Sequence, residues 1–172
     1  ADAERPALAL LQRVMERQAA LVAKWMGLGF IHGVMNTDNV ALSGETIDYG
    51  PCAFMDDFQN AKVFSSIDHG GRYAYGGQPS VAHWNMVQCA QALLPLIDDD
   101  EERAVELAQE AVDGFGVLYA AEHKRMANAT LGLDADSHDG PQLLAEMLTA
   151  MQAAGSDFTN SFVALKENRF DD

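Results

Sequence analysis

The sequence predicts a mostly helical protein with a small β-hairpin. Apolar residues recur at three- and four-residue steps within residues 6–28 and again within residues 79–97, which is the spacing of amphipathic helices. Between these segments, residues 41–47 have the composition of two short apolar strands joined by a Ser-Gly turn. A length of 172 residues, of which 48% are hydrophobic, is enough for one core. We therefore expect a single domain over residues 1–172.

The first predicted element is an amphipathic helix over residues 6–28, so that residues 1–30 lead into the polar loop that follows. Pro6 suits the first turn of this helix, and Gly27 and Gly29 are expected to end it. The apolar face consists of Leu8, Leu11, Met15, Ala19, Val22 and Met26. A long helix that feeds a buried connection and then a polar loop is also how many kinase C-lobes present their catalytic loop.

Residues 31–51 carry the polar side chains that are best suited to chemistry. Asp38 and Asn39 lie just before the predicted hairpin, and Asp48 lies just after it, so all three are expected on loops at its two ends. A base and two hard oxygen ligands placed in this way can surround a cation and its phosphates, as phosphoryl transfer requires. The alternative is that these three residues only form turns, which Asp and Asn favour.

Residues 52–78 form the next segment, which has little periodicity and many turn-forming residues. An irregular connection of this length is unusual in a compact domain, so we expect it to be functional or mobile. In a kinase-like arrangement it occupies the position of the activation segment. Arg72, in its glycine-rich part, could hold a phosphate, a protein acceptor or a local carboxylate such as Asp68.

Residues 79–172 are predicted to form a helical subdomain. Helices are expected over residues 79–97, 98–126, 141–154 and 157–169. Pro95 is expected to stop or kink the first of these helices. The five acids from Asp98 to Glu102 suit the N-terminus of the second, where the helix dipole favours negative charge. Gly114 and Gly116, inside the second helix, mark either a close packing point or a break.

Charge and composition argue against several classes of partner. The chain has 26 acidic and 11 basic residues, and its net charge of −15 repels a nucleic-acid backbone. It has neither a run of about 18 apolar residues nor a secretory signal at its start, so no membrane partner is expected. Cys52 and Cys89 lack the spacing of a zinc site or of a disulfide framework. These features fit a bacterial-type cytoplasm, and a mitochondrial setting stays open for a eukaryotic relative.

Three motifs occur in order along the chain. They are the loop from His32 to Asn39, the run from Thr46 to Pro51, and the run from Gly70 to Pro79 with Trp84-Asn85 beyond it. Together they resemble the SelO family, also called the YdiU family, most strongly over residues 20–97. The resemblance implies a protein-kinase-like C-lobe, taken from a pseudokinase that acts as a protein adenylyltransferase.

One residue separates this sequence from ordinary kinases. A kinase catalytic loop reads His-x-Asp-x-x-x-x-Asn, and aligning Asn39 with its asparagine places His32 on the histidine and Val34 on the catalytic aspartate. The usual base is therefore absent. The family resemblance offers Asp38 in its place as the catalytic base. His32 is interpreted as a packed, hydrogen-bonded structural residue.

The resemblance also implies cofactors and a reaction. In that family ATP is bound in a flipped orientation, so that AMP is transferred to a Ser, Thr or Tyr hydroxyl of a protein and pyrophosphate is released. Asn39 and Asp48 are expected to bind Mg²⁺ or Mn²⁺ and, through the metal, ATP. Asp48 would open the counterpart of the kinase Asp-Phe-Gly motif.

A member of this family also has an N-lobe, whose phosphate-binding lysine and paired glutamate have no counterpart in this sequence. We therefore interpret the chain as a C-lobe fragment whose partners are the N-lobe of the parent chain, ATP and protein substrates. The fragment is expected to bind ATP weakly or not at all and to have no turnover. Its exposed docking face is expected to favour self-association.

Two other function classes remain open on sequence grounds. One is an ATP-dependent kinase or small-molecule phosphotransferase that uses the same metal ligands, and Val34 in the aspartate position argues against it. The other is a non-catalytic helical interaction module, in which Asp48 would contribute to neither metal nor nucleotide binding. Transfer of α-labelled or γ-labelled phosphate from ATP would separate the first class from an adenylyltransferase.

Overall fold

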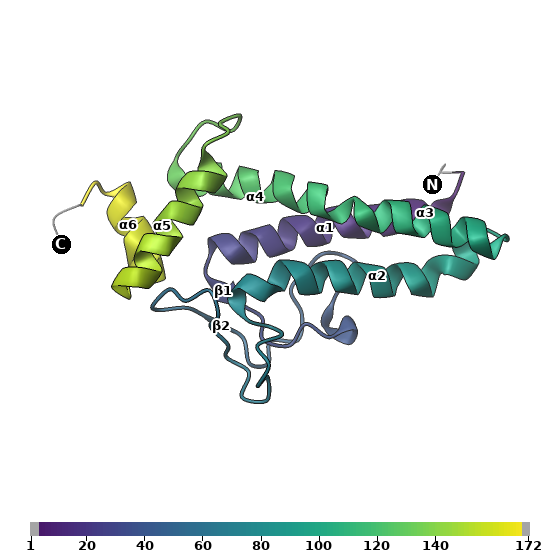
Figure 1. The fold of residues 1–172 in the computed structure, drawn as a ribbon, viewed down its shortest axis with the longest axis horizontal. Helices are drawn as coiled ribbons and strands as arrows, with labels where there is room; N and C mark the ends of the chain where they lie inside the picture. The colour runs from purple at the N-terminus through teal and green to yellow at the C-terminus, as the bar shows by residue number, and fades with distance from the viewer. Residues whose placement is uncertain (1–3, 170–172) are drawn as a thin grey trace.

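A computed structural model describes residues 4–169, and most of these residues are helical (Figure 1). The α-helices are α1 (Pro6–Gly27), α2 (Gln78–Ile97), α3 (Glu101–Asp113), α4 (Phe115–Leu131), α5 (Gly140–Ala154) and α6 (Phe158–Lys166). The 3-10 turns are η1 (Thr37–Asn39) and η2 (Tyr75–Gly77), and the antiparallel sheet pairs β1 (Phe30–Ile31) with β2 (Ala53–Phe54). The predicted fold class, mostly helical with a small β component, is confirmed at this level.

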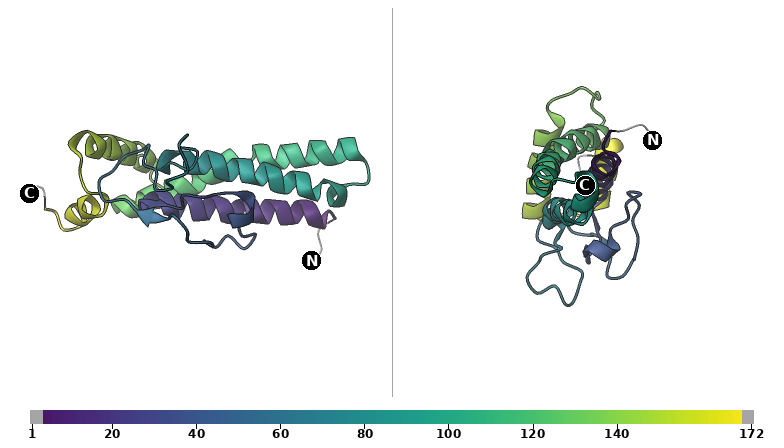
Figure 2. Two further views of the ribbon diagram at one scale, coloured as in Figure 1. Left: turned by 90° about the horizontal axis from the view of Figure 1, so that it is seen from below. Right: turned by 90° about the vertical axis from the view of Figure 1, so that its right-hand side faces the viewer.

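Helix α1 is the element against which the bundle is assembled. It packs against both α2 and α4, and α3 packs against α2 (Figures 1 and 2). Leu11 and Val22 of α1 are 0% exposed, and Met86 of α2 and Phe115 of α4 are nearly as buried. Full burial of a side chain of this size contributes about 1.5–3 kcal/mol. Across residues 4–169, no helix has both the length and the apolar character that crossing a membrane requires.

Polar and glycine residues define the helix ends much as expected. The Asp100 carboxylate accepts a hydrogen bond from the Arg103 backbone N–H (3.0 Å), which caps α3 within the predicted acidic run. Asp157 caps α6 in the same way by accepting from Asn160 (2.7 Å). Pro95 lies inside α2, which ends two residues later at Ile97. The predicted helix boundaries in this half of the chain are therefore correct to within a few residues, with one exception.

The exception is the helix expected over residues 98–126, which is two helices. α3 ends at Asp113 and α4 begins at Phe115, with Gly114 between them. The Gly114 N–H bonds to the Ala111 carbonyl three residues back (3.0 Å), which tightens the last turn of α3. Glycine is a weak helix former, so a break costs least at this position. Of the two readings of this glycine, the break is correct.

The hairpin predicted for residues 41–47 was wrong in its position. Only a single bridge joins Val40 to Thr46, whereas the paired strands are β1 and β2, in the register Phe30 to Phe54 and Ile31 to Ala53. Residues 41–47 are partly or fully exposed and have no neighbouring strand. Instead, the Gln18 side-chain amide of α1 donates to the Ala41 carbonyl (2.7 Å). Contacts with a helix therefore replace a strand ladder here.

The segment between β1 and α2 forms an irregular layer along one side of the bundle (Figure 1). A second apolar cluster holds its far end against α5 and α6. This cluster includes Ile31, Met55, Phe58, Tyr75 and Phe158. The Tyr75 hydroxyl also donates to the Met26 carbonyl at 2.6 Å. Residues 52–78 are mostly irregular, as predicted, and the second cluster packs their two ends through Met55, Phe58 and Tyr75, whereas Ile67 in between is 81% exposed.

The two cysteines are partly buried in the fold. Cys52 and Cys89 are both free and half-buried. Burial raises the pKa of the Cys89 thiol, so the thiol stays neutral near pH 7. Cys89 is therefore interpreted as a packing residue and not as a reactive thiol, and Cys52 also packs against the main apolar core.

Candidate active site

Asp38 and Asn39 lie together in η1. The Asn36 carbonyl accepts from the Asn39 backbone N–H (3.0 Å), which closes the turn. The Asn39 side-chain amide donates to the Val34 carbonyl (3.0 Å), so its nitrogen is used and its Oδ1 atom remains available as a ligand. Asp38 is exposed, and its carboxylate makes no hydrogen bond or ion pair within the described residues. The turn thus presents a free carboxylate next to a free amide oxygen.

Asp48 lies on the second loop, in an unusual backbone conformation. Its φ of 53° is in the left-handed region, and its carbonyl accepts from the Gly50 N–H two residues on (2.7 Å). Holding a non-glycine residue there costs about 1–2 kcal/mol, although aspartate tolerates it better than most residues. The carboxylate is exposed and has no partner among residues 4–169. Such strain is often found where a side chain must be aimed at a ligand.

This strain leads to a stability prediction. Asp48→Gly is expected to stabilise the 172-residue chain by about 1 kcal/mol, because glycine adopts positive φ without a steric cost. For a chain of this size the melting temperature should rise by about 2–4 °C. Asp48→Ala is the matched control, since it removes the same carboxylate but keeps the strained conformation. Thermal unfolding followed by circular dichroism would contradict the prediction if the two variants melted together.

His32 connects the two loops. Its ring is buried, and the Val34 backbone N–H donates to Nδ1 (3.4 Å) while Nε2 donates to the Ile47 carbonyl (2.8 Å). This arrangement assigns the neutral tautomer with the proton on Nε2. Asn39, Val34, His32 and Ile47 therefore form one continuous chain of hydrogen bonds. The chain ends one residue before Asp48, so it joins the two loops that carry the candidate ligands.

Two side chains of α2 make hydrogen bonds to the backbone of the loop that contains His32. Gln78 is fully buried, accepts from the His32 backbone N–H (3.0 Å) and donates to the Phe30 carbonyl (2.9 Å). Asn85 donates to the Met35 carbonyl (3.0 Å). The sequence interpretation named both residues only as parts of motifs and missed these roles. The signal was present, because amide side chains on the inward face of a helix need buried partners.

Helix α1 holds the second loop. The Trp25 indole N–H donates to the Thr46 hydroxyl (3.0 Å), and the Trp25 ring lies 5.4 Å from that of His32. Gly33 has a φ of 83°, and a Cβ atom at this position would lie 2.9 Å from the Pro51 carbonyl oxygen. Only glycine therefore allows the two loops to approach this closely. The loops are packed together, and their relative position is set by buried residues.

Arg72 does not pair with Asp68. The Asp68 carboxylate accepts from the backbone N–H groups of Arg72 (2.9 Å) and Tyr73 (2.8 Å). The guanidinium of Arg72 lies 4.6 Å from the centre of the Trp84 ring. Of the three readings of Arg72, pairing with the local carboxylate is excluded, and contact with a phosphate or a protein acceptor remains a prediction.

The donors present suit a hard divalent cation. No group of three or more His, Cys, Asp or Glu side chains that could hold a metal occurs in the described part of the chain. The Asn39 Oδ1 atom and the Asp48 carboxylate offer two kinds of oxygen ligand. Mg²⁺ is often held by only one or two protein groups, with substrate phosphates and water completing its octahedron. The donor set therefore fits a metal that arrives with a nucleotide and not a pre-formed metal cage.

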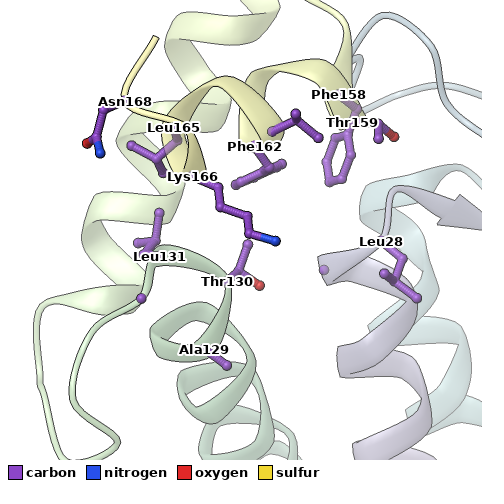
Figure 3. A pocket seen from close by; sticks show the side chains of 13 residues that line it. Leu28, Ala129, Thr130, Leu131, Phe158, Thr159, Phe162, Leu165, Lys166 and Asn168 are labelled. Atoms are coloured by element: carbon purple, nitrogen blue, oxygen red, sulfur yellow. The ribbon is translucent and has the colours of Figure 1, made fainter. Parts of the chain in front are cut away.

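A pocket of about 810 Å³ lies elsewhere, between the ends of α1 and α4 and helix α6 (Figure 3). Leu28, Phe158 and Phe162 give it an apolar lining, and the Lys166 side chain reaches across it toward Thr130. None of Asp38, Asn39 and Asp48 lines this pocket. A groove of about 350 Å³ lies beside η1 and includes Thr37. Asp38, Asn39 and Asp48 thus lie outside this pocket, on exposed or partly exposed loops.

Comparison with known proteins decides the family. The family model described as "Protein adenylyltransferase SelO" matches residues 1–172. The chain belongs to the SelO family. Proteins named "Protein nucleotidyltransferase YdiU" are similar to it along almost its whole length. The relative from Methylorubrum populi is 52% identical over 162 residues, which is 94% of this chain and 32% of the relative.

Other relatives in the SelO family agree with this assignment. The YdiU protein of Rhodopseudomonas palustris is 50% identical over 171 residues, which covers 99% of this chain and 35% of the relative. The one from Clostridium perfringens is 47% identical over 172 residues, with 100% and 35% covered. The chain spans about a third of the length of the curated relatives it matches. The resemblance drawn from the three motifs is confirmed.

Proposed function

We propose that this chain is the kinase-like C-lobe of a protein adenylyltransferase and that it carries half of the active site. The observation that supports this most directly is the hydrogen-bond chain from Asn39 through His32 to Ile47, which couples the two loops. If Asp38, Asn39 and Asp48 only formed turns, a buried histidine that joins their two loops would not be expected. Membership of the SelO family supports the same function.

In the proposed reaction, Asn39 and Asp48 hold Mg²⁺ or Mn²⁺ together with the phosphates of ATP. A metal held there would supply the positive charge that offsets the charge developing on the phosphates. Asp38 accepts the proton of a Ser, Thr or Tyr hydroxyl of a protein substrate. The hydroxyl oxygen forms a bond to the α-phosphorus, the bond from this phosphorus to the bridging oxygen breaks, and pyrophosphate leaves. The product is an AMP–protein phosphodiester.

A kinase is the second candidate, and Val34 argues against it. This residue takes the place of the catalytic aspartate of kinases, and both of its backbone polar groups are occupied by His32 and Asn39. Because the side chain of valine has no ionisable group, no carboxylate can act from position 34. Asp38 lies four residues further along the loop, so its carboxylate would act from a different position relative to the metal. A shifted base is consistent with attack at a different phosphorus.

The rest of the parent protein is proposed to complete the nucleotide cleft. Large apolar side chains are exposed on the same loops that carry the candidate ligands: Tyr49, next to Asp48, is 66% exposed, and Leu42, which follows η1, is 54% exposed. Exposed apolar groups of this size commonly mark a surface that another domain covers. We accordingly expect the 172-residue chain alone to bind ATP weakly and to transfer no AMP.

The test compares label transfer from ATP by the full-length parent and by the 172-residue chain. With Mg²⁺ or Mn²⁺ present, the parent is expected to incorporate label from α-labelled ATP into protein and none from γ-labelled ATP. The chain alone is expected to incorporate neither. Transfer of the γ-label would establish a kinase instead, and auto-modification by the isolated chain would refute the half-site proposal.

A further inference from the structure

The segment before α2 is fastened to the catalytic loop at one polar contact. The Tyr73 hydroxyl donates to the Asn36 side-chain oxygen at 2.6 Å, across 37 residues of sequence. This contact joins the irregular segment of residues 52–77 to the residue that immediately precedes η1. Neither side chain is a metal ligand or the base in the proposed reaction.

Tyr73 is held rigidly at its backbone end. Asp68 accepts from its backbone N–H (2.8 Å) and from that of Arg72 (2.9 Å), which fixes the turn. The Arg72 guanidinium lies between two rings, 5.8 Å from the centre of the Tyr73 ring and 4.6 Å from that of Trp84 on α2. With its backbone and ring both supported, Tyr73 presents its hydroxyl at a fixed point in front of the catalytic loop.

Asn36 passes this restraint directly to Asp38 and Asn39. Its carbonyl accepts from the Asn39 N–H (3.0 Å), so Asn36 closes the turn in which Asp38 is the middle residue. The Asn36 side chain makes no capping bond to η1 and is therefore free to accept from Tyr73. The His32 ring and the Asn85 side chain hold the other end of the loop, at Val34 and Met35. Near Asp38, the bond from Tyr73 adds a restraint from another segment to the hydrogen bonds that the loop makes within itself.

We propose that Tyr73 is a positioning residue for the transfer reaction, which acts through Asn36 to hold the Asp38 carboxylate at the acceptor hydroxyl. This inference rests on the proposed function and extends it. Asn36 is exposed, so water can replace the hydroxyl and the bond contributes little to stability. Its effect is on geometry, since a base displaced by about 1 Å can lose about 100-fold in rate.

The experiment uses the full-length parent and measures incorporation of α-labelled AMP into the parent protein itself. Tyr73→Phe removes only the hydroxyl, and Asn36→Ala removes only its acceptor. Tyr119→Phe is the matched control, because it makes the same chemical change in α4, a helix that carries none of the candidate site residues. Each test variant is expected to lower kcat about 10-fold or more while KM for ATP stays within about twofold. The melting temperature should stay within about 2 °C of that of the wild type.

The double variant identifies the mechanism. If the two side chains act through their shared bond, Tyr73→Phe combined with Asn36→Ala loses no more activity than either change alone. Asn36→Ala keeps the Tyr73 hydroxyl, so its loss of rate cannot come from removing an AMP acceptor. Additive losses, or a Tyr73→Phe variant as active as Tyr119→Phe, would overturn the inference. A wild-type parent that incorporates no α-label would instead refute the proposed function.

Discussion

Replacing Asp48 by asparagine in the full-length parent is expected to lower AMP transfer at least about 100-fold, which corresponds to about 2.7 kcal/mol of lost transition-state stabilisation. Asparagine has the shape of aspartate but lacks its charge, so it remains a neutral oxygen ligand like Asn39. The exposed carboxylate has no other partner among the described residues, so its loss should disturb the fold little. The expected loss is therefore in metal and nucleotide binding.

A loss of metal binding can be distinguished from misfolding by measuring how the rate of AMP transfer depends on the concentration of the divalent cation. Asp48→Asn is expected to need a higher Mg²⁺ or Mn²⁺ concentration for half-maximal transfer, because the site has lost one negative charge. Asp134→Asn is the matched control, since Asp134 is also exposed but lies in the loop between α4 and α5. If Asp48→Asn and the control transferred AMP equally, the non-catalytic interaction module would become the better interpretation.

The sequence predicted the helices well because their signals are local. Apolar spacing in α1, the Asp100 cap and the Asp157 cap each act within about one turn of helix. The break at Gly114 was one of two readings, since local sequence shows where a helix is weak but not whether packing will bridge it. The candidate ligands were also found locally, as Asp and Asn residues in two loops.

The paired strands could not be predicted because they are formed by distant segments. β1 and β2 contain only two residues each and lie 22 residues apart in sequence, with the site loops between them. Two-residue strands carry no alternating pattern to detect. The apolar run at residues 41–47 was the stronger sequence signal, yet α1 side chains bind that segment instead. The Tyr73–Asn36 contact could not be predicted for the same reason, since it joins residues 37 positions apart and depends on the path of residues 52–77 in the fold.

The second prediction with a large expected effect concerns His32, whose ring makes two hydrogen bonds that different substitutions can remove separately. Its Nε2–H holds the Ile47 carbonyl beside Asp48, and its Nδ1 atom holds the Val34 backbone in the loop of Asn39. Glutamine can place an amide N–H near the position of Nε2, whereas asparagine is too short to reach it and can replace only Nδ1. His32→Gln is therefore expected to keep the bond to Ile47, which joins the two loops, and His32→Asn to keep the bond to Val34, which lies within the first loop.

Both variants are expected to destabilise the protein by about 2–4 kcal/mol, because each removes a buried aromatic ring that contacts Trp25 and Phe30. AMP transfer by the parent should differ between them, with His32→Gln keeping about 10-fold more activity than His32→Asn at a temperature where both are folded. Circular dichroism supplies that temperature. If asparagine preserved the activity better, the Ile47 bond would be dispensable, and the loop of Asp48 would have to be positioned by the Trp25–Thr46 bond and the close contact of Gly33 with Pro51.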